Sequence, residues 1–130
     1  MKLEEIQKIV EEVYPKIEKH YGYSKFFPET TPYIEYETSI YGRLSGEEDD
    51  GTFGEQSPHA EFERIDNSII LYYPKMEDRE HIVQTLVHEY QHYLQSPSWM
   101  KRYYDMGYDY HTHPYEVAAY AEEVNYTKFI

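Results

Sequence analysis

The chain has 130 residues and a formal net charge of −13, from 25 acidic and 12 basic side chains, and it contains no cysteine. This length predicts a single domain over residues 1–130, large enough to bury about two-thirds of the surface that the unfolded chain exposes. The acidic charge opposes binding to nucleic acid or to anionic membranes, and the lack of cysteine excludes disulfides and thiolate metal sites.

The sequence gives no sign of a membrane or secretory segment. No stretch approaches the ~20 consecutive apolar residues that span a bilayer. The N-terminus, MKLEEIQKIVEE, mixes charged with apolar residues and lacks the apolar core of a secretory signal. We therefore expect a soluble, cytoplasmic protein without a nucleic-acid or membrane partner.

Residues 3–21 have the pattern of an amphipathic helix. Their apolar residues recur at steps of three and four with Lys and Glu between them: Leu3, Ile6, Val10, Val13 and Ile17. The turn-rich segment FFPETTP follows. The next run, YIEYETSIYG at 33–42, alternates in the manner of a half-buried strand.

Residues 45–58, SGEEDDGTFGEQSP, are glycine-rich and acidic and predict a loop. An alternative interpretation of the acidic run is a calcium loop, although it lacks the alternate-position ligands of an EF-hand. The following runs, HAEFERI and SIILYYP, are separated by Asp66 and Asn67 and predict an antiparallel hairpin.

The last part of the chain predicts two helices. The segment EDREHIVQTLVHEYQHYLQS, residues 77–96, predicts a helix that Pro97 ends. A tyrosine-rich connection then leads to a last helix that begins at Pro114. The order helix, strands, helix, helix predicts an α+β fold with a small three- or four-stranded sheet.

A possible metal site lies in the helix over 77–96, where the segment LVHEYQHYL places His88 and His92 four residues apart. Helical residues at this spacing lie one above the other about 6 Å apart, so the two imidazoles can bind one ion. Rotation by about 100° per residue puts both histidines opposite the apolar stripe of this helix. Two interpretations remain: a metal site, or two histidines exposed to solvent on a polar face.

Glu89 directly follows the first histidine, and this order suits hydrolysis. Zinc lowers the pKa of a bound water to about 7. Glu89 is placed to take a proton from that water without binding the metal itself. The motif HExxH has few fixed letters and occurs by chance, so its helical context is what favours zinc. Histidine and carboxylate ligands also suit iron, cobalt or nickel.

The third ligand of such a site must come from elsewhere, because catalytic zinc usually has three protein ligands. The metzincin motif would place Gly and His where this chain has Gln95 and Ser98, which excludes that subclass. Glu116, in the first turn of the last predicted helix, is either the third ligand or a capping-box carboxylate. His81 lies about 10 Å from His88 along the helix axis, cannot share the ion, and is expected to be exposed.

These motifs resemble the gluzincin metallopeptidases, and most closely the minigluzincins, which are small soluble domains of about this length. The family has HExxH on one helix and a glutamate ligand on the next, often within N-P-x-E-x-x-A. This chain has HEYQH at 88–92 and HPYEVAA at 113–119. The resemblance implies that His88, His92 and Glu116 bind one zinc ion per chain. It also implies that Glu89 is the general base and acid, and that Ala119 lets the two helices approach.

The resemblance covers the whole chain in layout, but only its last third in motif. It implies a leading helix, a short sheet whose edge strand holds an extended peptide, and hydrolysis of a peptide or protein substrate. Some minigluzincins are latent because their own C-terminal segment blocks the cleft. The chain departs from the pattern at His113, where asparagine is usual, and at Tyr120, where thermolysin-type gluzincins have an aspartate that supports the first histidine.

Three functions are open at this point. The first is a zinc metallopeptidase, whose oxyanion-stabilising group is not marked: His111, His113 and several tyrosines are candidates. The second is a catalytically silent, zinc-stabilised binding or regulatory module, which has no need of Glu89. The third is a metal-free interaction domain, whose stability a chelator would leave unchanged.

Overall fold

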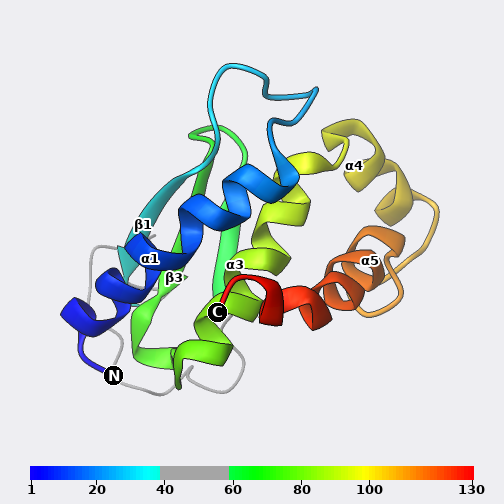
Figure 1. The fold of residues 1–130 in the computed structure, drawn as a ribbon. Helices are drawn as coiled ribbons and strands as arrows, with labels where there is room; N and C mark the ends of the chain where they lie inside the picture. The colour runs from blue at the N-terminus through cyan, green and yellow to red at the C-terminus, as the bar shows by residue number, and fades with distance from the viewer. Residues whose placement is uncertain (39–58) are drawn as a thin grey trace.

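The computed structural model describes residues 1–38 and 59–130. This part of the chain forms an α+β fold with four α-helices and a three-stranded mixed sheet (Figure 1). None of these helices is long and apolar enough to cross a membrane. The predicted loop at 45–58, with its calcium-site alternative, lies outside the described residues.

The first predicted helix is confirmed as α1 (Leu3–Tyr21). One of its faces is buried, with its side chains at helical spacing: Ile6, Val10, Val13, Tyr14 and Ile17. The helix ends at Gly22, which has a φ of 74° and donates its N–H to the carbonyl of Glu18. Since this positive φ favours glycine, the sequence itself determines where α1 stops.

The predicted hairpin is also confirmed. β2 (Ala60–Glu63) pairs antiparallel with β3 (Ser68–Tyr72). Asn67, in the turn between them, has a φ of 51°, which asparagine tolerates better than most residues. β1 (Tyr33–Glu37) forms the first half of the strand predicted at 33–42; Thr38 is described outside it, and residues 39–42 lie outside the described chain. It pairs parallel with β3, so the order is β1-β3-β2, and β2 lies at an edge of the described sheet.

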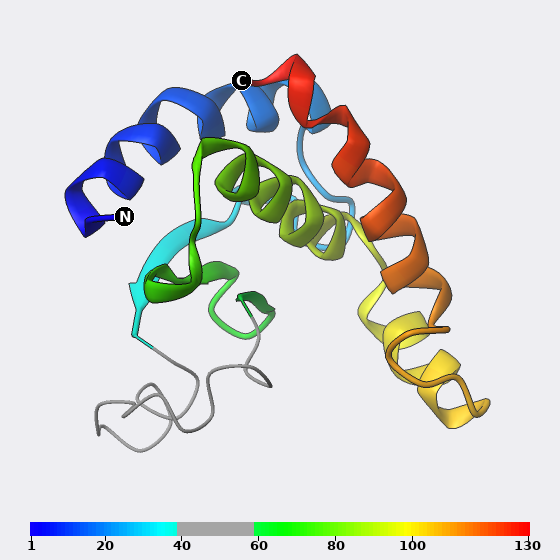
Figure 2. The same cartoon turned by 90° about the horizontal axis from the view of Figure 1, so that it is seen from below.

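α3 (Arg79–Leu94) is the central helix and confirms the helix predicted over 77–96. Asp78 caps it by accepting the N–H of His81. α3 contacts α1, β2, β3 and the two C-terminal elements, α5 (Pro114–Glu122) and the 3₁₀ segment η2 (Glu123–Lys128). Figure 2 shows the chain from α5 to the C-terminus running beside α3 and returning to α1.

The sequence predicts a connection directly after Pro97, and this prediction is wrong. Residues 97–105 form a further helix, α4 (Pro97–Asp105). Pro97 occupies the first turn of α4, where its missing N–H is not needed, and the hydroxyl of Ser96 accepts the N–H of Trp99. The same proline therefore marks the end of one helix and the start of the next.

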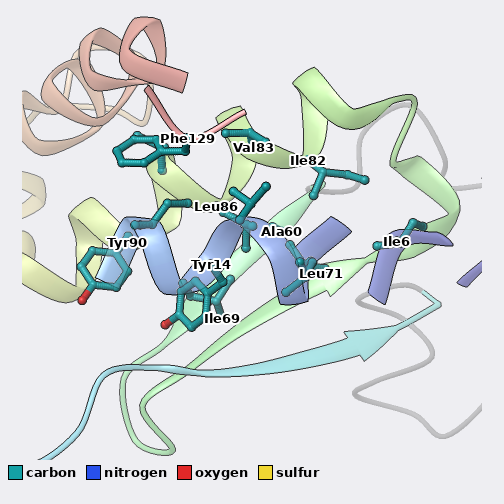
Figure 3. Packing of buried hydrophobic residues seen from close by; sticks show 14 of the residues in the cluster. Ile6, Tyr14, Ala60, Ile69, Leu71, Ile82, Val83, Leu86, Tyr90 and Phe129 are labelled. Atoms are coloured by element: carbon teal, nitrogen blue, oxygen red, sulfur yellow. The ribbon is translucent and has the colours of Figure 1, made fainter. Parts of the chain in front are cut away.

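The core lies between the sheet and the two helices α1 and α3. Ile69 and Leu71 of β3 meet Leu86 of α3 and Tyr14 of α1 in one cluster, so both helices cover the same face of the sheet (Figure 3). Phe129, close to the C-terminus, is 2% exposed and belongs to the same cluster. The C-terminal segment is therefore part of the core.

Candidate metal centre

The structure brings His88 and His92 of α3 together with Glu116 of α5. Each residue offers one ligand atom, and these atoms all lie within 4.8 Å of one another. Oε1 of Glu116 is 2.6 Å from Nε2 of His92 and 3.1 Å from Nε2 of His88. All three side chains are at most 9% exposed, because α5 and η2 cover this face of α3. The interpretation of a solvent-exposed histidine pair is wrong.

The residues present fit a divalent transition metal. Two imidazoles and one carboxylate are a ligand set of catalytic zinc. Tetrahedral ligands at the usual zinc distances lie about 3.3 Å from one another. The two contacts of Glu116, 2.6 and 3.1 Å, are slightly shorter, so its carboxylate would have to move away from the imidazoles to admit an ion. The group can hold a metal, and its geometry does not distinguish zinc from other transition metals.

Glu116 reaches the histidines because of the way α5 begins. Pro114 occupies the first turn, and the Nδ1 atom of His113 caps the helix by accepting the N–H of Tyr115. The N–H of His113 donates to the carbonyl of Asp109 and makes no bond to Glu116. The capping-box interpretation of Glu116 is therefore wrong.

His113, which replaces the asparagine usual in the family pattern, also ties α5 to α4. Its Nε2 atom lies 2.9 Å from the carbonyl oxygen of Met100, and its ring is completely buried. Histidine therefore performs the capping role and makes a second bond that asparagine is too short to make. Ala119, one turn after Tyr115, is also completely buried in α5, which contacts α3. A small residue at this position is consistent with close packing of the two helices.

Each histidine is also held by a hydrogen bond at its other ring nitrogen. The Nδ1 atom of His88 lies 2.7 Å from Oε2 of Glu123, and that of His92 lies 2.7 Å from Oε1 of Gln95. Such bonds place the ring proton on Nδ1, turn Nε2 toward a metal, and raise the basicity of the imidazole. Glu123 thus offers His88 the carboxylate partner that the thermolysin-type pattern would take from an aspartate at position 120.

Glu123 is not among the site residues predicted from the sequence, although its spacing carries a signal. Glu123 follows Glu116 by seven residues, or two helical turns, so both residues project from the same side of α5 and its continuation. A search for acidic residues two turns after the third ligand would have found it.

The contacts shift the pKa values of the ligands in opposite directions. Burial alone would lower the pKa of His88, but its hydrogen bonds to Glu116 and Glu123 outweigh burial and raise the pKa to about 10. Burial would raise the pKa of Glu116, but hydrogen bonds from His88 and His92 lower it to about 2. His88 therefore carries a proton between two carboxylates at neutral pH, in a place where a metal cation can replace that proton.

Glu89 lies next to this group and is only 8% exposed. Burial raises the pKa of its carboxyl, and the charges of His92 and His88 oppose this effect. A raised pKa makes the carboxylate a stronger proton acceptor, which suits a general base. Both the position and the environment of Glu89 therefore suit proton transfer.

A cavity of about 790 Å³ opens onto the four residues. Its walls come from the edge strand β2, from α3, α4 and α5, and from the connection between α4 and α5. His81 lies at one end, where its Nε2 atom is 2.9 Å from Nδ1 of His59. The expectation that His81 is exposed is wrong, because it is half-buried against His59.

The C-terminal segment lies away from this cavity. Tyr126 and Phe129 pack against the hydrophobic core, and within the described chain no residue after Glu123 lines the cavity. This segment therefore reaches the candidate site only through Glu123.

Comparisons with models of protein families, with curated proteins and with solved structures found no match. Any function must therefore be inferred from the site itself.

Proposed function

We propose that this chain is a zinc-dependent metallopeptidase of the gluzincin type, with the zincin-like layout that its motifs resemble. The observation that carries the proposal is the convergence of His88, His92 and Glu116, with the buried carboxylate of Glu89 beside them. The cavity next to these residues has room for a bound peptide segment.

A zinc ion held by the three ligands would act as a Lewis acid. Glu89 then accepts a proton from the attacking water and delivers it to the amine of the leaving group. Glu123 and Gln95 keep the two imidazoles in the orientation and tautomer that bind a metal.

The edge strand β2 is the proposed binding surface for the peptide backbone. In the described sheet β2 pairs on one side only, with β3, and Ala60, Glu61 and Phe62 line the cavity. An extended peptide can pair with the outer side of such a strand through main-chain hydrogen bonds. We therefore infer a peptide or protein substrate.

The open cavity favours this function over that of a zinc-stabilised binding module. Structural zinc is almost always enclosed by four protein ligands, whereas catalytic sites have three and leave a position for water. Among the described residues the metal-binding group contains three members, and Glu89 lies beside it. This is the donor count expected of a catalytic site.

The test is hydrolysis of a mixed library of fluorescence-quenched peptides by zinc-loaded protein, beside Glu89→Gln. The variant should retain zinc and lose about 10²–10⁴-fold in rate, since a general acid or base contributes about that much. Glu80→Gln is the control, because it makes the same change of charge at an exposed position of the same helix. A zinc-loaded wild type that cleaves no peptide would leave the binding module as the better interpretation.

A further inference from the structure

Tyr120 lies one helical turn after Glu116, on the same side of α5. Its ring centroid is 4.5 Å from that of His88, with the two planes at 71°. The position at which the thermolysin-type pattern has an aspartate is thus occupied by an aromatic ring that packs edge-on against the first histidine. Tyr120 also lines the cavity, together with His88, Glu89 and Glu116.

A second tyrosine is held beside it. Tyr110 belongs to the connection between α4 and α5, and its hydroxyl lies 3.1 Å from that of Tyr120. Both residues line the cavity together with His88, Glu89 and Glu116. Burial raises the pKa of Tyr110, and the charges of Glu116 and Glu89 add to the effect. With its pKa raised, the hydroxyl of Tyr110 stays protonated at neutral pH and can donate a hydrogen bond.

The other candidates named from the sequence are less suitable. Both ring nitrogens of His113 are already bonded, to Tyr115 and Met100. His111 packs against Tyr110 but does not line the cavity. Tyr110 and Tyr120 both line the cavity, and each hydroxyl is held by the other. Because the ring of Tyr120 packs against His88, Tyr120 is suited to positioning, and Tyr110 is the better candidate for the donor.

We propose that Tyr110 is a catalytic residue whose hydroxyl stabilises the oxyanion, and that Tyr120 is the positioning residue that holds it. When water attacks the scissile carbonyl carbon, the π electron pair of that carbonyl moves to its oxygen, and the proton lost by water passes to Glu89. Tyr110 keeps its own proton and donates a hydrogen bond to the negative oxygen. This inference rests on the proposed peptidase function.

The test compares Tyr110→Phe and Tyr120→Phe with Tyr108→Phe, a control that removes a hydroxyl from the same connection outside the cavity. For each zinc-loaded protein we would measure zinc content, kcat and KM. Calorimetry would give the affinity for a phosphonamidate peptide, whose tetrahedral anion mimics the oxyanion. The affinity for the matched cleavage product would report ground-state binding.

We expect Tyr110→Phe to retain its zinc and its product affinity while losing about 10²–10³-fold in kcat, as removal of an oxyanion donor does. Its phosphonamidate affinity should fall in parallel. Tyr120→Phe should lose less, about tenfold, and Tyr108→Phe nothing, because only Tyr110 is to contact the reacting oxygen.

Three results would overturn the assignment. An active wild type beside a Tyr110→Phe variant with unchanged kcat and phosphonamidate affinity would refute the role of Tyr110 alone. Tyr104 is another tyrosine of the cavity. If Tyr110→Phe were unimpaired and Tyr104→Phe lost kcat and phosphonamidate affinity instead, Tyr104 would be the residue that stabilises the oxyanion. A zinc-loaded wild type that hydrolyses nothing would instead refute the proposed function, and this assignment with it.

Discussion

Glu123 offers a sensitive test of how the metal centre is built. Its carboxylate lies 2.7 Å from Nδ1 of His88, and the two side chains are 24% and 8% exposed. This bond is charge-assisted and largely shielded from water, so it fixes the ring and raises its basicity. Removing such a partner typically weakens metal binding 10–100-fold. We expect Glu123→Ala to weaken zinc binding about 100-fold, or ~2.7 kcal/mol, and Glu123→Gln, which keeps an acceptor oxygen, about tenfold.

The assay is a zinc titration against a chelator of known affinity, at fixed pH and ionic strength. Glu122→Gln is the matched control, because it removes the same charge from the neighbouring position, where the carboxylate bonds to Tyr21 and Asn125. The control should bind zinc within about twofold of the wild type, since the carboxylate of Glu122 bonds to Tyr21 and Asn125 and not to a histidine of the metal-binding group. If all three variants bound zinc equally well, the orienting role of Glu123 would be refuted.

Four further outcomes are expected. Leu86 is completely buried, so Leu86→Ala should lower the free energy of unfolding by about 2–5 kcal/mol in a urea titration. Ile65 is 93% exposed, so Ile65→Ala should change that free energy by less than about 0.5 kcal/mol. Equal effects would contradict the described core. His113→Ala should lower the melting temperature more than His113→Asn, because asparagine still caps α5 but cannot reach Met100; the reverse order would show that the cap is unimportant. Zinc binding at pH 7 must displace the proton that a pKa of about 10 keeps on His88. The affinity for zinc should therefore rise about tenfold per pH unit from pH 7 to 9 for each proton released. Calorimetry in buffers of different ionisation enthalpy would count the released protons. A zinc affinity independent of pH would contradict this prediction. In the metal-free protein, folding stability should change with pH in the opposite direction to zinc affinity. The stability contributed by the raised pKa of His88 is complete below about pH 6.5 and is lost as the pH rises toward 10.

The elements that the sequence predicts well are those with strong local signals. α1 combines regular apolar spacing with a glycine at its end, and α5 begins with a proline in its first turn. α4 escapes prediction because Pro97 marks the end of the preceding helix, although proline is equally suited to the start of one. The parallel pairing of β1 with β3 could not be predicted, since it joins strands 35 residues apart without a local turn signal.

The part of the candidate site that the sequence predicts is the part that depends on local spacing. His88, Glu89 and His92 share one helix, so their arrangement follows from helical spacing alone. The approach of Glu116 depends on how α5 packs against α3, so the sequence alone left it open between a metal ligand and a helix-capping carboxylate. The pairing of Glu123 with His88, and of Tyr110 with Tyr120, depends on tertiary packing and therefore emerged only from the structure.

The central claim is that His88, His92 and Glu116 hold one metal ion. The most direct test is elemental analysis of the wild type and of Glu116→Ala after loading with zinc and exhaustive dialysis. Circular dichroism of both proteins would verify that the variant is folded. We predict about one zinc per chain in the wild type and its loss in the folded variant, because two imidazoles alone leave zinc short of a third protein ligand. A wild type that retains no metal, or a variant that retains as much as the wild type, would contradict the claim.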